Sequence, residues 1–374
     1  MPSRNEYTVG WICAINVEYV AATAFLDETH EQVEDIPRED DNVYVLGRLG
    51  HHNIVVASLP DGEYGTESSG RVARDLVRSF PNVKIGLMVG IGGGVPSKRH
   101  DIRLGDVVVS ASSNGEPGVF QYDFGKLIQE GDFQYTRVLN QAPALLRNAV
   151  ALVKCRYQRD GHQLQETINM ILQRNPRLRK NYRKPPANTD RLYVREFVHP
   201  SHTNVACGES CGDDDSVLIP RAPREEDEDN PTIHYGLIAS GNSLMKDAEA
   251  RDRLAELKDV LCIEMEAAGL MNHYPCLIIR GICDYADSHK NKNWQGYAAM
   301  AAAAYAKDLL SGIPAHKVET VAPLRAMERS TILKWITQKD YGSAHTVHLA
   351  RRTDGTGQWF LDSPVFKTWL ENDR

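Results

Sequence analysis

Short apolar runs alternate with helix-forming segments along this chain. This alternation restricts the possible folds more than any other property of the sequence. Residues 8–16 (TVGWICAIN), 53–59 (NIVVASL) and 85–89 (IGLMV) are apolar runs with β-branched residues, a pattern typical of buried strands. Residues 17–26 and 68–80 lie between them and carry alanine or apolar residues at helical spacing, which predicts helices. This rhythm predicts an α/β sheet whose ligands bind beyond the strand ends.

The rhythm breaks in the middle of the chain and is lost again near its C-terminal end. Residues 155–232 are polar, with a basic stretch followed by an acidic one, so we expect a loop-rich insertion with partial order. Further strands are expected at 107–111, 235–240, 260–264 and 276–282, and further helices at 243–258 and 294–310. We therefore expect one α/β domain over residues 1–314 and a helical or linker extension over residues 315–374.

Composition and charge exclude several classes of protein. The chain has 43 lysines and arginines against 50 aspartates and glutamates, a formal net charge of −7, which argues against a general nucleic-acid-binding protein. No run approaches the roughly 20 apolar residues that a membrane-spanning helix needs. The first residues lack the pattern of a secretory signal peptide, and the seven cysteines stand at scattered spacings rather than in a disulfide framework. We therefore expect a soluble, cytoplasmic protein that binds neither nucleic acid nor membrane.

Four acidic residues stand where apolar strands end. Glu18 follows the first strand, Glu264 and Glu266 follow the strand at 260–264, and Asp284 ends the strand at 276–282. Any one of them alone is more simply explained as a helix cap or as half of a buried ion pair. Four such acids at the strand ends of one predicted sheet favour a catalytic site, because two carboxyl groups in different environments can serve as acid and base.

A glycine run follows the strand at 85–89, in the sequence VGIGGGV. Glycines permit a close approach of backbone to a ligand, and their amides can bind an anion or sugar oxygens. The run matches neither the dinucleotide fingerprint nor the P-loop. Glycines alone are weak support for a site, and a plain turn is the simpler interpretation.

A fourth pattern joins two histidines and two cysteines within the insertion. His199, His202, Cys207 and Cys211 give the spacing H-x2-H-x4-C-x3-C, which could hold one tetrahedral zinc ion. The spacing is not that of a standard zinc finger and the surrounding sequence indicates a loop. An unliganded surface loop is therefore the favoured interpretation, and no metal is expected.

Five segments together resemble the purine nucleoside phosphorylase / uridine phosphorylase superfamily: ICAINVEYVAA, VGIGGGV, YGLIASGN, CIEMEAAGL and IIRGICDYAD. Within it the chain is most similar to methylthioadenosine/adenosylhomocysteine-type nucleosidases, in the form found at the N-terminus of fungal NOD-like receptor proteins. The resemblance implies a three-layer α/β/α sandwich with a central mixed, partly barrel-like sheet, no cofactor and a homo-oligomer. The segment DGTGQWFLDSPVFKTWL is similar to the one that precedes the NACHT domain in those proteins, which implies such a domain downstream in a longer protein.

The resemblance also implies roles for single residues. Asp284 aligns with the general acid that protonates the purine, and Glu18 aligns with the carboxylate that activates water. Glu266 aligns with the residue that holds the ribose hydroxyls, with Met265 beneath the sugar. Further positions that align with substrate-binding segments are Glu264, Gly92, Gly93, Asn242, Leu244 and Met245.

The departures from the family pattern bear on the hydrogen bonding around Asp284 and on the nucleophile. Cys283 stands where relatives have serine or threonine, and Ile91 stands where some have serine. Residues 10–12 (GWI) replace the Gly-Asp-Pro phosphate loop of many phosphorylases, which favours water over phosphate. We therefore expect a purine nucleosidase acting on adenine or other purine nucleosides or nucleotides, with ATP among the candidates. A phosphate-dependent phosphorylase and a non-catalytic nucleoside sensor are the alternatives.

Overall fold

A computed structural model describes residues 2–112, 115–129, 133–200, 207–212, 214–225, 228–290, 292–325 and 362–364. Contacts divide the chain into two units, Met1–Ala326 and Met327–Arg374, and all the elements below belong to the first. Most of the extension expected over residues 315–374 lies outside the described residues.

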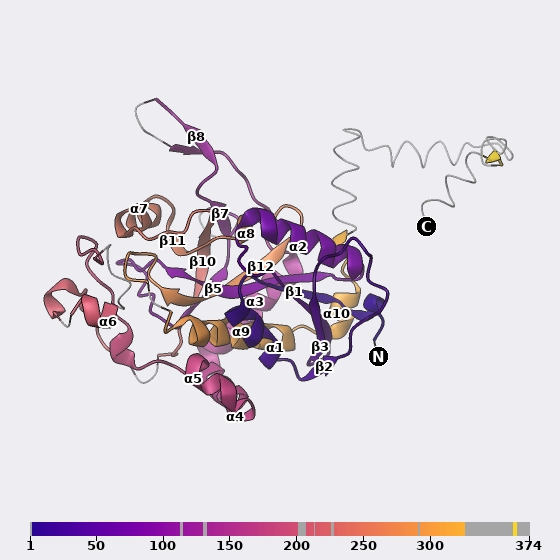
Figure 1. Ribbon diagram of the computed structural model, residues 1–374, viewed down its shortest axis with the longest axis horizontal. Coiled ribbons are helices and arrows are strands. Elements are labelled where there is room, and N and C mark those ends of the chain that lie inside the picture. Colours follow the sequence, from indigo (N-terminus) through magenta and orange to yellow (C-terminus); the bar gives the residue numbers. More distant parts are fainter. Residues whose placement is uncertain are drawn as a thin grey trace. The chain divides into compact units, whose positions relative to one another are not determined.

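A mixed sheet forms the centre of the first unit (Figure 1). Its strands are β1 (Val9–Cys13), β2 (Glu28–His30), β3 (Tyr44–Leu49), β4 (His52–Ser58), β5 (Ile85–Gly94), β6 (Val107–Ser110), β7 (Val119–Gln121), β10 (Ile233–Ser240), β11 (Val260–Glu264) and β12 (Cys276–Asp284). They follow the order β11-β10-β6-β12-β5-β1-β4-β3-β2, with β7 beside β10. Because β11 also pairs with β5, the strands β5, β12, β6, β10 and β11 close into a ring. The expected mixed, partly barrel-like sheet is therefore confirmed.

Helices cover both faces of the sheet. They are α1 (Asn16–Ala24), α2 (Thr66–Ser79), α3 (Ala144–Asp160), α4 (Leu164–Arg174), α5 (Arg179–Tyr182), α6 (Cys207–Ser210), α7 (Ala248–Lys258), α8 (Ala267–Leu270), α9 (Gln295–Ser311) and α10 (Ala315–Glu319). Short 3₁₀ helices span Arg4–Glu6, Pro176–Leu178, Ala187–Thr189 and Asp215–Val217. Figure 1 shows α2 and α8 on one face and α1 and α9 on the other, as a three-layer sandwich requires.

The insertion is more helical than its polar composition indicates. Residues 155–232 contain the end of α3 together with α4, α5 and α6. In α4, Leu164, Ile168, Ile171 and Leu172 are buried, because their spacing places them on one face of the helix. That face packs on α9, so the apolar stripe gives the insertion an ordered core.

A small hairpin projects from the body of the unit (Figure 1). It consists of β8 (Gly125–Leu127) and β9 (Phe133–Tyr135), which pair only with each other among the described strands. None of the helices that the structure describes combines the length and the apolar character needed to cross a membrane.

Gly281 marks the close approach of α9 to β12. A Cβ added there would collide with the carbonyl oxygen of Ala298 on α9. We expect Gly281→Ala to lower the free energy of unfolding by about 1–3 kcal/mol through overpacking, as measured by chemical denaturation. Gly70→Ala on α2 is the matched control: its Cβ would meet the Gly269 carbonyl oxygen at an ordinary 3.4 Å, so stability should be unchanged or slightly higher. Equal stability of the two variants would contradict this packing.

Candidate active site

The register of the parallel strands β5 and β12 determines which residues of the candidate site lie opposite one another. Arg280 lies opposite Gly90 and Asp284 lies opposite Gly93, while β11 pairs with the end of β5 and brings Glu264 to the same region. The three strands therefore bring together residues that lie far apart in the sequence. Polar groups gather where the strands end, as expected for an α/β sheet.

Arg280 is the centre of a buried network of charges. Its guanidinium is fully buried. Nη2 contacts a carboxylate oxygen of Glu264 and lies 3.3 Å from Oε2 of Glu266; Nη1 lies 3.8 Å from Oε1 of Glu18. A buried cation is stable only when it is paired, and here one cation faces three carboxylates. No role was predicted for Arg280, although a cation inside the apolar strand LIIRGICD indicates a buried ion pair.

Burial around Arg280 changes the titration of two of these acids. Burial raises the pKa of Glu266 to about 7; Arg280 opposes this rise and the charges of Glu264 and Glu18 add to it. Burial likewise raises the pKa of Glu18, against Arg280 and three backbone amides. Both groups therefore hold protons more readily than an exposed glutamate and titrate closer to neutral pH.

Glu18 sits in the first turn of α1 and is held by backbone amides. Its Oε2 accepts hydrogen bonds from the amides of Ala14 (2.6 Å) and Ile15 (3.2 Å), and its Oε1 accepts one from Ile91 (2.8 Å). A Cβ at Gly90 would collide with the carboxylate. The glycine at this position is therefore required to admit Glu18 against β5.

Glu264 and Glu266 flank the start of α8. Glu264 accepts hydrogen bonds from the amides of Glu266 and Ala267 at 3.1–3.2 Å, besides contacting Arg280. Glu266 accepts a bond from the amide of Gly65 at 3.4 Å, and Met265 between the two glutamates is half-buried. These contacts make Glu264 an anchor for Arg280 and α8, whereas Glu266 has fewer protein partners.

Asp284 is partly exposed and is met by three donors. Its Oδ1 accepts a hydrogen bond from the amide of Ala286 (2.8 Å) and lies 3.2 Å from Nζ of Lys290. The thiol of Cys283 donates to Oδ2 at 3.4 Å. The ion pair with Lys290 is not visible in the sequence, because it depends on the path of the loop after β12.

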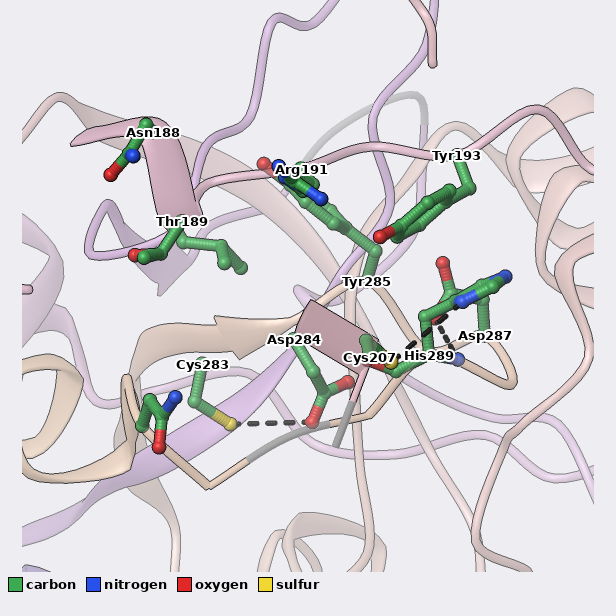
Figure 2. Close-up of a pocket in the computed structure, with 12 residues that line it drawn as sticks. Asn188, Thr189, Arg191, Tyr193, Cys207, Cys283, Asp284, Tyr285, Asp287 and His289 are labelled. Atoms are coloured by element: carbon green, nitrogen blue, oxygen red, sulfur yellow. Dashed lines mark hydrogen bonds between the residues drawn. The ribbon is translucent and has the colours of Figure 1, made fainter. Parts of the chain in front are cut away.

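A cavity of about 170 Å³ lies beside Asp284 (Figure 2). Its walls come mainly from the insertion and from the end of β12 with the loop that follows it, and Leu104, which lies before β6, completes them. Its lining residues are Leu104, Asn188, Thr189, Arg191, Tyr193, Cys207, Cys283, Asp284, Tyr285, Asp287, His289 and Asn293. The insertion therefore forms one wall beside Asp284, which its polar composition did not predict.

The glycine run belongs to a strand, so the simpler interpretation of a plain turn is wrong. Gly92 and Gly93 lie within β5, which extends to Gly94 because it pairs with both β12 and β11. A Cβ at Gly93 would lie 2.9 Å from Oδ1 of Asp284. The run thus admits two carboxylates against β5, Glu18 at Gly90 and Asp284 at Gly93.

The segment after β10 reaches the site through Asn242. Its Oδ1 accepts hydrogen bonds from the amide and the hydroxyl of Thr66, each at 3.0 Å, and its own amide donates to Asp123 at 2.6 Å. Leu244 is 55% exposed, and Met245 packs on the core around β10 and β11. Asn242 therefore joins this segment to the start of α2, next to the Gly65 amide that meets Glu266.

The histidine and cysteine pattern is brought together in part. His199, Cys207 and Cys211 lie close to one another, and the fourth member of the group is His289 from the loop after β12. His202 lies outside the described residues. Spacing alone could not find His289, because it comes from a distant segment of the chain.

The raised pKa of Glu266 should make folding stability depend on pH. Between about pH 4.5 and 7 the folded protein keeps a proton that the unfolded chain has released, so the free energy of unfolding should fall as pH rises through this window. Glu266→Gln removes the titrating group. The decrease in the free energy of unfolding with pH should therefore become smaller by about 1 kcal/mol per pH unit. Denaturation of both proteins at pH 5, 6 and 7 measures this, and a variant with the wild-type slope would contradict it.

Comparisons with known proteins relate this chain to phosphorylases and nucleosidases. Residues 193–329 match the family described as "Phosphorylase superfamily". The chain is 47% identical over 306 residues to a nucleotide-binding leucine-rich repeat (NLR)-like protein of Hyaloscypha variabilis, which covers 82% of this chain and 29% of that protein. It is also 39% identical over 84 residues to an Escherichia coli protein named ATP nucleosidase Cap17, covering 21% of this chain and 17% of that one. The chain thus spans less than a third of either relative.

A solved structure shares the fold. The 5′-methylthioadenosine/S-adenosylhomocysteine nucleosidase of Neisseria meningitidis, in complex with methylthio-immucillin-A, matches with a TM-score of 0.51 and 14% identity. The match covers 81% of this chain and 98% of that one. The described domain therefore corresponds in fold to nearly the whole of that protein.

Proposed function

This chain contains a nucleoside phosphorylase/nucleosidase-like domain, and we propose from this premise that it is a purine nucleosidase. The reaction is hydrolysis of the N-glycosidic bond of an adenine or other purine nucleoside or nucleotide. The products are the free base and the ribose product. ATP is the leading nucleotide candidate, because one relative carries the name ATP nucleosidase.

One observation carries the proposal: the carboxylates of Glu18 and Asp284 lie against the same glycine run. The amide of Ile91 holds Glu18, and Gly93, two residues further along β5, lies against Asp284. Glu266 joins Glu18 through Arg280. A nucleoside bound across β5 could therefore meet one carboxyl group at its base and others at its sugar.

The proposed roles follow from the chemistry of glycosidic cleavage. As the C1′–N bond breaks, the sugar gains positive charge and the base gains negative charge, so nearby carboxylates stabilise the sugar and a general acid assists the base. Asp284 delivers a proton to the purine nitrogen. Glu18 takes a proton from the water whose oxygen bonds to C1′, and exchange with solvent restores both groups. Glu266 accepts hydrogen bonds from the ribose hydroxyls.

The structure supports water rather than phosphate as the nucleophile. Residues 10–12, which replace a phosphate loop, lie within β1, and Trp11 there is fully buried. Such a segment offers no loop for an anion. A triphosphate would also need cations near the mouth of the site. Two arginines considered for this role, Arg71 and Arg103, form ion pairs instead, with Glu63 and Asp101 respectively, each at 2.5 Å.

The substrate range is tested with the full chain in phosphate-free buffer. Adenosine, guanosine, inosine, methylthioadenosine, uridine and ATP are incubated separately and the free base is measured by chromatography. The proposal predicts release from purine substrates and none from uridine. Faster release from uridine than from any purine would contradict the purine preference, and the order of ATP and adenosine decides between nucleotide and nucleoside.

Three further expectations from the sequence remain proposals. They are a homo-oligomer, a downstream NACHT-type domain in a longer protein, and a cytoplasmic location. Size-exclusion chromatography with light scattering tests the first of them directly.

A further inference from the structure

We propose that His199, Cys207, Cys211 and His289 bind one zinc ion, which fastens the insertion to the loop that follows Asp284. One ligand atom from each of the four side chains lies within 4.8 Å of the others. Three of the residues, Cys207, Cys211 and His289, are buried, and His199 is half-buried. The proposal concerns a site separate from the carboxylates around Arg280 and does not depend on the proposed hydrolysis.

The distances between the ligand atoms fit a tetrahedral metal site. Nδ1 of His199 lies 3.1 Å from Sγ of Cys211 and 3.5 Å from Sγ of Cys207. Nδ1 of His289 lies 3.4 Å and 3.8 Å from the same two sulfur atoms. Zinc bonds of about 2.3 Å to sulfur and about 2.0 Å to nitrogen give nitrogen–sulfur edges of about 3.5 Å in a tetrahedron. The four groups therefore surround a space of the right size.

Local structure fixes each ligand. Cys207 begins α6, and the amide of Cys211 donates to the carbonyl oxygen of Cys207 at 3.0 Å, so one helical turn places both thiols on the same side. Both sulfur atoms belong to free cysteines. Two thiols and two imidazoles are ligands that zinc prefers and that magnesium and calcium do not.

His289 is oriented for metal binding by its other ring nitrogen. Nε2 lies 2.8 Å from the carbonyl oxygen of Phe197 and can only donate to it, which leaves Nδ1 as the acceptor that faces the thiols. The ring also stacks on Tyr193 (both are labelled in Figure 2), and the two ring centroids lie 3.9 Å apart. A backbone carbonyl on the second nitrogen is the usual support of a metal-binding histidine.

The site acts on the loop that follows Asp284. Asp287 accepts a hydrogen bond from the amide of His289 at 2.9 Å. Lys290, which follows His289, forms an ion pair with Asp284. In the same loop, two residues after the end of β12, Ala286 has a φ of 53°. Residues with a Cβ rarely adopt this backbone conformation. Such a backbone persists where its surroundings hold it, and a metal bound to His289 would supply that hold.

The test is the zinc content of the full chain after expression in zinc-supplemented medium and removal of loosely bound metal by gel filtration. We expect about one zinc per chain in the wild type and almost none in Cys207→Ser/Cys211→Ser. Cys155→Ser, at an exposed free cysteine, is the matched control and should keep the metal. Cobalt(II) reconstitution gives a second readout, because thiolate ligands produce a characteristic charge-transfer absorption.

Two more variants identify the fourth ligand. His289→Ala should lose the zinc, whereas His202→Ala should retain it. A folded wild type without zinc, with its cysteines either free or joined as a Cys207–Cys211 disulfide, would overturn the proposal. Equal zinc in the wild type and the double cysteine variant would also overturn it, as would loss of zinc in His202→Ala with retention in His289→Ala.

Discussion

Replacement of Asp284 by asparagine should lower kcat for base release about 10²- to 10⁴-fold, because an amide has no acidic proton to give the departing purine. The side chain keeps its size, and the amide of Ala286 still has an oxygen to bond, so the fold should be preserved. Rates of base release with saturating substrate measure the effect, and circular dichroism checks the fold.

Asp160→Asn is the control for this variant. Asp160 lies at the exposed end of α3 and pairs only with its neighbour Arg159 among the partners described, so its amide should leave kcat unchanged. Substrate binding to Asp284→Asn, measured by calorimetry, separates catalysis from recognition. A variant that binds the nucleoside and releases base at the wild-type rate would remove Asp284 from the mechanism.

Replacement of Glu18 by glutamine should cause a loss of similar size, about 10²- to 10⁴-fold in kcat. Glutamine keeps one oxygen for the amides of Ala14 and Ile15 but loses the second oxygen that accepts from Ile91. It also cannot take a proton from water. Burial raises the pKa of Glu18, so the wild-type rate should fall as the pH is lowered and this group becomes protonated, at a higher pH than for an exposed glutamate. The variant should lack that fall. A rate profile between pH 4 and 8 for both proteins measures it.

Glu256→Gln, at an exposed position on α7, is the control and should keep the wild-type profile. Arg280 keeps Glu264 and Glu266 as partners in Glu18→Gln, so the variant is expected to fold. Turnover close to the wild-type rate in phosphate-free buffer would show that another group activates the nucleophile.

The sequence allowed most of the central sheet to be predicted, for a local reason. The runs at 8–16, 53–59, 85–89 and 276–282 are apolar enough to be buried wherever they lie, and the structure places a strand at each. The strands β2 and β3 and the short strands β7, β8 and β9 were not predicted. Their identity depends on pairing with neighbours, which a local pattern does not record.

The residues of the candidate site likewise fall into those that could be predicted from the sequence and those that could not. Acids at strand ends were found, because the end of an apolar run is visible in the sequence. Arg280 was not assigned, since its role comes from three carboxylates contributed by different segments. Lys290 and His289 were missed because only the path of the loop after β12 brings them to Asp284 and to the cysteines.

The most direct test of the central proposal is base release from adenosine and ATP by the full chain, with and without inorganic phosphate. The proposal predicts the same release in both arms, with free ribose or ribose phosphates as the second product. Release that requires phosphate and yields a sugar 1-phosphate would make the protein a phosphorylase. Nucleoside binding without release in either arm would make it a sensor, and both outcomes would contradict the hydrolase.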